Sequence, residues 1–226
     1  MLPHSGQRSG FGRKRRDPHL NPRTLERYTI AGPAGALEIA LNVPDAPHAG
    51  IALIAHPNPT EGGTLDNKVV HTLAKALFGL SYVAVRFNYR GVGASEGTFD
   101  EGAGETDDAL AALAHARERA GAALPVVLAG FSFGAFIASK VAATVTPQRM
   151  VLVGPAVGRF AVERVPPDTI VIHGEEDDVV PLASVLAWAR PQELPVTVFP
   201  GCGHFFHGRL TQLASVIGGM WQQPRR

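Results

Sequence analysis

A serine flanked by glycines stands where a predicted strand gives way to a predicted helix. Residues 130–134 are Gly-Phe-Ser-Phe-Gly, preceded by an apolar run at 125–129 and followed by a helical pattern at about 133–145. A nucleophile at the tip of so sharp a turn stands out toward a substrate, and the glycines give the backbone the clearance that the turn needs. The pattern indicates that Ser132 is a nucleophile; a glycine-rich turn that merely contains a serine is the alternative.

A serine nucleophile needs a base, and the base needs a carboxylate to orient it. His204 is the candidate base, since it follows a predicted strand at 195–199. An acidic run after the predicted strand at 169–172 contains Glu175, Glu176, Asp177 and Asp178. Spacing alone leaves open whether Asp177 or Asp178 is the acid, and His207 competes with His204 as the base. We expect no metal site, because His204, His207 and Asp178 lack a third histidine or cysteine at zinc-site spacing.

These residues need a scaffold that brings the ends of several strands together. The pattern predicts strands at 26–31, 36–43, 51–55, 82–87, 125–129, 150–153, 169–172 and 195–199. It predicts one helix that is capped by Asp66 and further helices at 105–120, 133–145, 182–190 and 208–222. A Gly-Pro-Ala-Gly turn at 32–35 predicts an antiparallel hairpin for the first two strands. Strands that alternate with helices predict a parallel sheet with helices on both faces and a site beyond the carboxyl ends of the strands.

Six segments together resemble the α/β-hydrolases, and more narrowly small bacterial members known only as predicted hydrolases. They are 56–59 (HPNP), 61–63 (EGG), 67–70 (NKVV), 86–93 (RFNYRGVG), 130–134 (GFSFG) and 204–207 (HFFH). The resemblance covers about residues 28–222 and implies an α/β-hydrolase fold with a mostly parallel eight-stranded sheet. It also implies a Ser-Asp-His triad. The motifs G-x-x-D-x-x-V-P and G-x-G-H then assign Asp177 and His204 as the partners of Ser132.

An enzyme of this type also needs two backbone N–H groups for the oxyanion. One belongs to the residue after the nucleophile, here Phe133. The other comes from the loop after the strand at 51–55, where Asn58 lies between Pro57 and Pro59, which have no N–H. Asn58 is therefore the predicted second donor, although an asparagine in this setting is also typical of a plain turn.

The stretch between the predicted strands 150–153 and 169–172 is too short for a lid domain, so we expect an open site. Candidates for its walls, or for the core, are Phe131, Phe133, Phe160, Phe205 and Phe206. We expect a carboxylesterase-like serine hydrolase that cleaves small or medium carboxylic esters of a small-molecule acyl substrate through an acyl-enzyme. Thioesterase, peptidase and dienelactone-type reactions on the same triad are alternatives, as is a non-catalytic binding protein. No cofactor is expected, because the glycine-rich loop 91–97 lacks the spacing of a dinucleotide fingerprint.

Composition excludes several classes of protein. The 226 residues include one cysteine, Cys202, which excludes a disulfide-stapled scaffold, and no apolar run approaches the roughly 20 residues of a membrane helix. Residues 1–27 carry 7 Lys or Arg against 2 Asp or Glu, whereas residues 28–226 carry 14 against 18. We therefore predict a basic tail at 1–25 and a single domain at 26–226. The tail is expected to be solvated, with nucleic-acid or lipid contact or a transit peptide as alternatives. The lack of a secretory pattern and the single thiol favour the cytoplasm.

Overall fold

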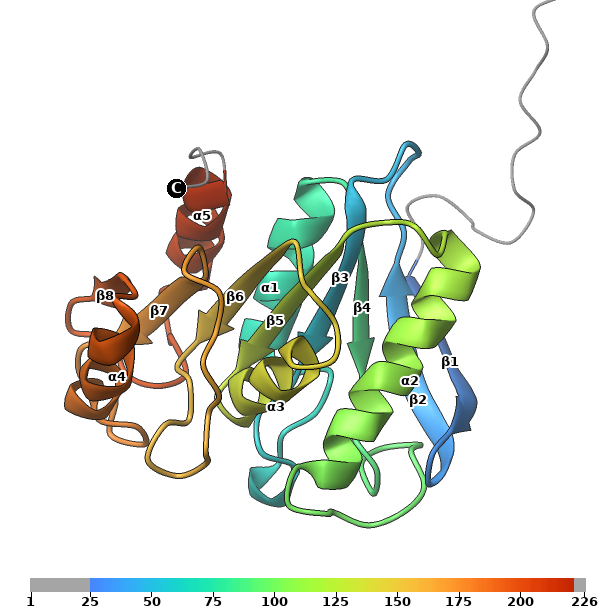
Figure 1. Ribbon diagram of the computed structural model, residues 1–226, viewed down its shortest axis with the longest axis horizontal. Coiled ribbons are helices and arrows are strands. Elements are labelled where there is room, and N and C mark those ends of the chain that lie inside the picture. The colour runs from blue at the N-terminus through green and yellow to red at the C-terminus, as the bar shows by residue number, and fades with distance from the viewer. Residues whose placement is uncertain (1–24, 222–226) are drawn as a thin grey trace, which may run out of the picture.

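The computed structural model describes residues 25–221, which fold around a single sheet (Figure 1). Its strands are β1 (Leu25–Gly32), β2 (Gly35–Asn42), β3 (Gly50–Ala55), β4 (Tyr82–Phe87), β5 (Val126–Phe131), β6 (Arg149–Val153), β7 (Ile170–Gly174) and β8 (Val196–Phe199). Of the predicted basic tail at 1–25, only Leu25 falls within the described residues, where it begins β1. The rest of the predicted tail lies outside them.

The strand order in this sheet is β1-β2-β4-β3-β5-β6-β7-β8. β1 and β2 form an antiparallel hairpin and β2 pairs antiparallel with β4, while all other neighbours are parallel. Every residue of β3 through β7 is buried, as expected of parallel strands covered on both faces. The predicted fold class and hairpin are confirmed. The loops after the parallel strands leave the sheet at one edge, and the candidate site residues lie there.

Helices cover both faces of the sheet (Figure 1). They are α1 (Lys68–Gly79), α2 (Ala103–Ala120), α3 (Phe133–Ala142), α4 (Leu182–Ala189) and α5 (Leu210–Trp221), with short 3-10 turns η1 (Pro59–Glu61) and η2 (Arg190–Gln192). α1 and α5 pack together on one face, and α2, α3 and α4 cover the other. Alternate residues of the central strands therefore enter two separate apolar layers, one under each set of helices.

The cap of α1 differs from the prediction. Asn67, and not Asp66, caps the helix, because the Asn67 Oδ1 accepts from the Val69 N–H (2.9 Å) and the Val70 N–H (3.4 Å). Asp66 instead accepts a hydrogen bond from Arg27 of β1 at 2.8 Å. Asp66 therefore forms a long-range ion pair instead of the helix cap that local capping preferences predict.

Three helix boundaries also differ from the prediction by two or three residues, and one of them is the start of α2 at Ala103 instead of 105. α3 ends at Ala142, and the chain then turns ahead of Pro147, which disfavours helix in the residue before it. α5 begins at Leu210, because Gly208 has a φ of 72° that a helix does not accommodate.

No lid covers the carboxyl ends of the parallel strands, where the candidate site residues lie. The connection between β6 and β7 contains no helix, and its only strand-like contact is a single bridge between Val157 and Phe160. The expected lidless form of the fold is confirmed. Within residues 25–221, no helix combines the length and apolar character needed to cross a membrane.

Candidate active site

The turn from β5 into α3 holds Ser132 in a backbone conformation that side chains rarely adopt. Ser132 has φ 57° and ψ −117°, and residues at positive φ often mark functional sites where surrounding structure enforces the strain. A Cβ on Gly130 would overlap the carbonyl of Gly134, and a Cβ on Gly134 would overlap the carbonyl of Ala55 in β3. Close backbone approach therefore requires both glycines, in agreement with the predicted turn.

Backbone hydrogen bonds fix the direction of this turn. The Ser132 N–H donates to the Val153 carbonyl of β6 at 3.0 Å, and the Ser132 carbonyl accepts from the Ala135 N–H at 3.0 Å. The Phe133 N–H finds no acceptor within residues 25–221. It is the first N–H of α3, where the helix dipole is positive, so it is available to a developing oxyanion.

The side chains of Ser132, Asp177 and His204 meet at the carboxyl edge of the sheet, each after a different strand. The His204 Nε2 lies 3.0 Å from the Ser132 Oγ, and the His204 Nδ1 lies 2.6 Å from the Asp177 Oδ2. All three residues are buried, with exposed fractions of 5% for Ser132, 6% for Asp177 and 3% for His204. The structure thus brings together the three residues that the sequence analysis selected. In this geometry His204 can take the serine proton while Asp177 orients the ring.

The Asp177 carboxylate is held in its loop by backbone donors. Its Oδ1 accepts from the N–H groups of Val179 (3.0 Å) and Val180 (2.7 Å). Burial raises the pKa of this carboxyl, but hydrogen bonds from His204 and Val180 outweigh burial and leave the pKa below its ordinary value. Asp177 is therefore ionised at neutral pH. Its neighbour Asp178 is exposed.

A second histidine touches the same carboxylate, and sequence reasoning missed it. His173, the fourth residue of β7, is fully buried, and its Nε2 lies 2.8 Å from the Val180 carbonyl and 3.4 Å from the Asp177 Oδ2. Because a carbonyl only accepts, the His173 Nε2 carries the proton. Burial lowers the pKa of His173, which keeps the ring neutral at neutral pH. The available signal was its position at a strand end, four residues before the candidate acid.

The loop after β3 places Asn58 beside the start of α3. A Cβ on Gly134 would meet the carbonyls of Ala55 and His56, so the first turn of α3 lies directly against this loop. The Asn58 Oδ1 accepts from the Thr60 N–H (3.1 Å) and the Thr60 Oγ1 (3.0 Å), which makes the turn η1. The Asn58 backbone N–H has no acceptor among the described residues. Asn58 therefore makes a turn with its side chain and leaves its N–H free.

The far end of this loop is held by two side chains at the end of β4, a contact that the sequence analysis did not predict. The Leu65 N–H donates to the Asn88 Oδ1 at 2.8 Å, and the Leu65 carbonyl accepts from the Arg86 Nη1 at 2.8 Å. The Asn88 Nδ2 in turn donates to the Glu38 Oε2 of β2 at 2.7 Å. Arg86 and Asn88 both belong to the motif at 86–93. Two side chains of that motif therefore hold this loop.

His56 secures the near end of the loop. The ring is fully buried, its Nδ1 donates to the Pro57 carbonyl at 2.7 Å, and its Nε2 accepts from the Tyr89 N–H at 3.2 Å. Burial lowers the pKa of His56 to about 3, so the ring is neutral at any ordinary pH. The site geometry therefore gives His56 a structural role.

Phe205 forms an apolar surface beside the candidate base. Its side chain is 46% exposed, and its ring meets the His204 ring edge-on with centroids 5.1 Å apart. An open pocket of about 270 Å³ lies next to it, lined among others by Gly62, Lys68 and His207. This pocket joins the loop of the candidate oxyanion donor to the loop of the candidate base.

The other phenylalanines named as possible walls belong to the interior. Phe131, Phe133 and Phe206 are fully buried, and Phe160 is partly buried against Phe133 with ring centroids 4.9 Å apart. Phe205 is therefore the one member of the set with an exposed side chain.

Metal-ligating side chains do not gather within residues 25–221: no three histidine, cysteine, aspartate or glutamate residues there are close enough to hold an ion. His207, which competed with His204 in the sequence analysis, instead stacks its ring on Phe205 with centroids 5.8 Å apart.

Comparisons with known proteins identify the family to which this fold belongs. A hydrolase family described as serine aminopeptidase, S33, matches residues 61–162. An uncharacterized protein of Rickettsia prowazekii is 31% identical over 209 residues, which cover 82% of this chain and 84% of the relative. The crystal structure of an α/β serine hydrolase without lid from Xanthomonas campestris has a TM-score of 0.80 and 36% identity, covering 92% of this chain and 99% of that one.

A second solved structure is also similar to this chain over most of its length. An α/β serine hydrolase homologue from Coxiella burnetii has a TM-score of 0.79 and 40% identity, covering 86% of this chain and 96% of that one. Both structures are similar to this chain over nearly their whole length, and both are described as serine hydrolases of the α/β type. This chain therefore belongs to the α/β-hydrolase superfamily and has the lidless form of its serine hydrolase fold.

Proposed function

We propose that this protein hydrolyses small or medium carboxylic esters through an acyl-enzyme formed on Ser132. The observation that carries the proposal is the continuous hydrogen-bond chain from the Ser132 Oγ through the His204 ring to the Asp177 carboxylate, with steps of 3.0 and 2.6 Å. A carboxylate, an imidazole and a hydroxyl in this order are what nucleophilic acyl transfer needs.

In the first half-reaction the Ser132 Oγ attacks the ester carbonyl carbon as its proton passes to the His204 Nε2. The carbonyl oxygen becomes an oxyanion, which accepts hydrogen bonds from the backbone N–H groups of Asn58 and Phe133. The imidazolium then gives its proton to the leaving alkoxide, the bond from the carbonyl carbon to that oxygen breaks, and the alcohol departs. Asp177 stabilises the imidazolium without taking its proton.

In the second half-reaction a water molecule takes the place of the alcohol. His204 accepts a proton from this water as its oxygen attacks the acyl carbon, and the proton then returns to the Ser132 Oγ as the acyl-serine bond breaks. A carboxylic acid leaves and the hydroxyl is regenerated. Loss of one oxyanion donor in such enzymes costs about 3–4 kcal/mol of barrier.

The surroundings of the three side chains favour esters of modest size. The site lacks a lid, and the exposed Phe205 ring offers an apolar contact beside His204. The adjoining pocket of about 270 Å³ has room for an acyl or alcohol group of several carbon atoms.

Aminopeptidase activity is a second candidate, because the family model that matches residues 61–162 is described in those terms. An aminopeptidase needs a free carboxylate near the scissile bond to hold the substrate ammonium. Glu61, on the loop that carries Asn58, is already paired with Arg159. This pairing removes one candidate for that carboxylate.

A fluorophosphonate probe and a substrate panel test the proposal. We expect the probe to label the wild-type chain, and labelling to vanish in Ser132→Ala while the thermal unfolding midpoint is retained. Hydrolysis of p-nitrophenyl esters from acetate to octanoate should exceed that of aminoacyl p-nitroanilides and of acyl thioesters. Faster turnover of anilides would favour the peptidase. Ester turnover that persists unchanged in Ser132→Ala would refute the mechanism.

A further inference from the structure

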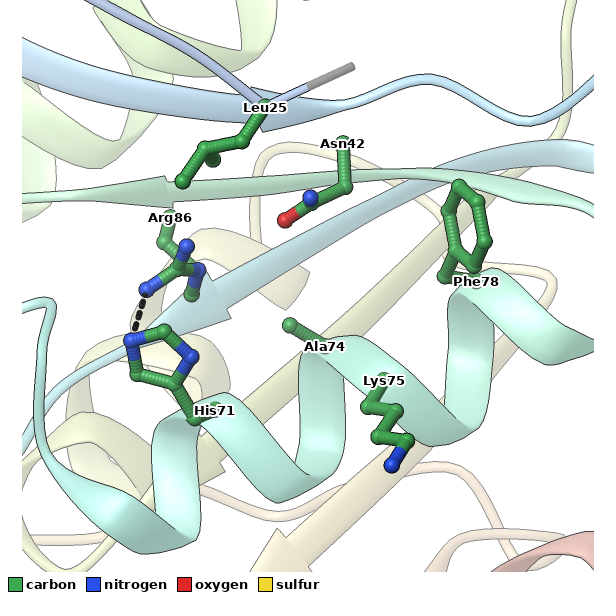
Figure 2. A pocket seen from close by; sticks show the side chains of 7 residues that line it. All are labelled: Leu25, Asn42, His71, Ala74, Lys75, Phe78 and Arg86. Carbon is green, nitrogen blue, oxygen red and sulfur yellow. Dashed lines mark hydrogen bonds between the residues drawn. The ribbon is translucent and has the colours of Figure 1, made fainter. Parts of the chain in front are cut away.

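A second pocket lies away from Ser132, between α1 and the hairpin side of the sheet (Figure 2). It has a volume of about 170 Å³, and its lining includes Leu25, Asn42, His71, Ala74, Phe78 and Arg86. Within residues 25–221, no hydrogen bond or ring contact links these residues to the Ser132, Asp177 or His204 side chains.

The Arg86 guanidinium at this pocket is buried but only partly satisfied. Its side chain is 2% exposed. Both of its hydrogen bonds within residues 25–221 come from Nη1, one to the Leu65 carbonyl (2.8 Å) and one to the His71 Nε2 (2.7 Å). The buried Nε has no hydrogen-bond partner, and no bond is described for Nη2 within residues 25–221. The Nε–Nη2 edge, which is the fork that matches a carboxylate, is therefore unpaired, and its Nε is closed to solvent.

Neighbouring groups compensate the charge of Arg86 only in part. Because a guanidinium only donates hydrogen bonds, the His71 Nε2 accepts in this contact and supplies no negative charge to Arg86. The nearest carboxylate, Asp66, lies 3.7 Å from the Arg86 Nη1, is half exposed, and also pairs with Arg27 at 2.8 Å. A buried cation that shares one solvated carboxylate leaves room for a further anion.

The lining determines which anion fits. Leu25, Ala74 and Phe78 supply apolar surface, while Asn42 and Arg86 supply polar groups (Figure 2). Asp66 already places one negative charge beside Arg86, which disfavours a dianion such as phosphate. We propose that this pocket binds a small monocarboxylate with a short apolar tail, whose carboxylate pairs with the Arg86 guanidinium and whose tail lies along Ala74 and Phe78.

The site would also bear on the loop that carries Asn58. The same guanidinium holds the Leu65 carbonyl, so a carboxylate that fixes Arg86 also stabilises the end of that loop. The binding proposal itself does not depend on ester hydrolysis.

NMR titration of the full-length ¹⁵N-labelled chain tests the site directly. Acetate, propionate and butyrate are added at constant ionic strength against sodium chloride. We expect saturable shifts of the Arg86 Nε–H and of the Asn42 and Ala74 amides, with a Kd of the order of millimolar. Affinity should rise about threefold for each added methylene, since the tail is buried. Inorganic phosphate should leave these signals in place.

Two charge reversals on α1 provide matched variants. Lys75 lines the pocket, whereas Lys68 lies two turns away outside it. Lys75→Glu should raise the butyrate Kd about three- to fivefold at low salt, and Lys68→Glu less than half as much. Arg86→Lys keeps the charge but removes the fork, and should abolish saturation if it folds; if it does not fold, the lysine pair decides.

Three outcomes would overturn the proposal. They are unmoved signals at 50 mM butyrate (well over tenfold above the expected Kd), equal shifts with phosphate, and equal effects of Lys75→Glu and Lys68→Glu.

Discussion

The turn at Ser132 and the loop from His56 to Asn67 lie against each other, but different parts of the chain hold them. The turn is made by five consecutive residues and anchored by the neighbouring strand β6 through the Val153 carbonyl. The loop is held by side chains distant in sequence: Asn88 and Arg86 after and within β4, and Glu38 in β2 behind Asn88.

This difference means that the two proposed oxyanion donors differ in how firmly they are placed. The Phe133 N–H is part of a helix end packed in the core, whereas the Asn58 N–H depends on a polar network that joins β4 to β2. Substitutions at the turn should therefore act on folding, and substitutions around the loop should act on the position of one donor.

The largest effect is expected from Gly134→Ala. The new Cβ would overlap the Ala55 carbonyl, which is backbone and cannot move cheaply. We expect destabilisation by about 3 kcal/mol or more, measured by chemical denaturation, and loss of fluorophosphonate labelling. Gly219→Ala in α5 is the control, because nothing lies within 4 Å of its added Cβ and alanine favours helix by about 1 kcal/mol over glycine. Equal stability of the two variants would contradict the close approach.

Acid should lower the free energy of unfolding through His56, which holds one end of the loop. The folded ring stays neutral down to a pKa of about 3, whereas an unfolded histidine gains its proton near pH 6.5. The unfolded state therefore binds more protons between these values, and stability falls as the pH drops through this window. His56→Gln should remove about 1.4 kcal/mol per pH unit from the slope between pH 6 and 4.5.

The measurement is the free energy of unfolding in urea at several pH values for both chains. The slope, and not the absolute stability, is the criterion, because the glutamine also changes packing. Parallel slopes for the two chains would show that His56 does not cause the acid sensitivity.

Asn88→Ala should loosen the loop and leave the turn intact. It removes the acceptor of the Leu65 N–H and a donor to Glu38, at a cost of about 1–3 kcal/mol for buried groups left unpaired. Hydrogen exchange should accelerate in peptides that cover 58–67 and stay unchanged at 128–136. We expect a roughly tenfold loss of ester kcat/KM from the displaced donor, below the full loss of an oxyanion group. Faster exchange at both segments would mean that the turn depends on the network too.

The smallest effect is expected from Arg159→Ala, which breaks the ion pair with Glu61 at the outer side of the loop. Both side chains are more than one third exposed, so solvent screening limits the change in stability to below about 0.5 kcal/mol. Arg164→Ala, at an exposed position on the same connection, is the control. A shift of several degrees in the unfolding midpoint for Arg159→Ala alone would assign this pair a larger role than its exposure allows.

Most elements of the fold could be predicted from the sequence because their signals are local. Apolar runs bounded by turn residues located all eight strands, and the spacing of Val69, Val70, Leu73 and Leu77 located the buried face of α1. The prediction that Asp66 caps α1 was wrong. Whether Asp66 bonds to a local N–H or to the distant Arg27 depends on how β1 lies against α1.

The candidate site divides in the same way. The amino-acid sequence by itself determined the strained serine turn and a short set of acids and bases after strand ends, because strand-end position and glycine spacing are properties of neighbouring residues. Only the tertiary structure decided that His173 stands behind the Asp177 carboxylate, and that Arg86 and Asn88 hold the Leu65 backbone. These choices depend on side-chain directions across separate strands, and those directions exist only once the sheet has assembled.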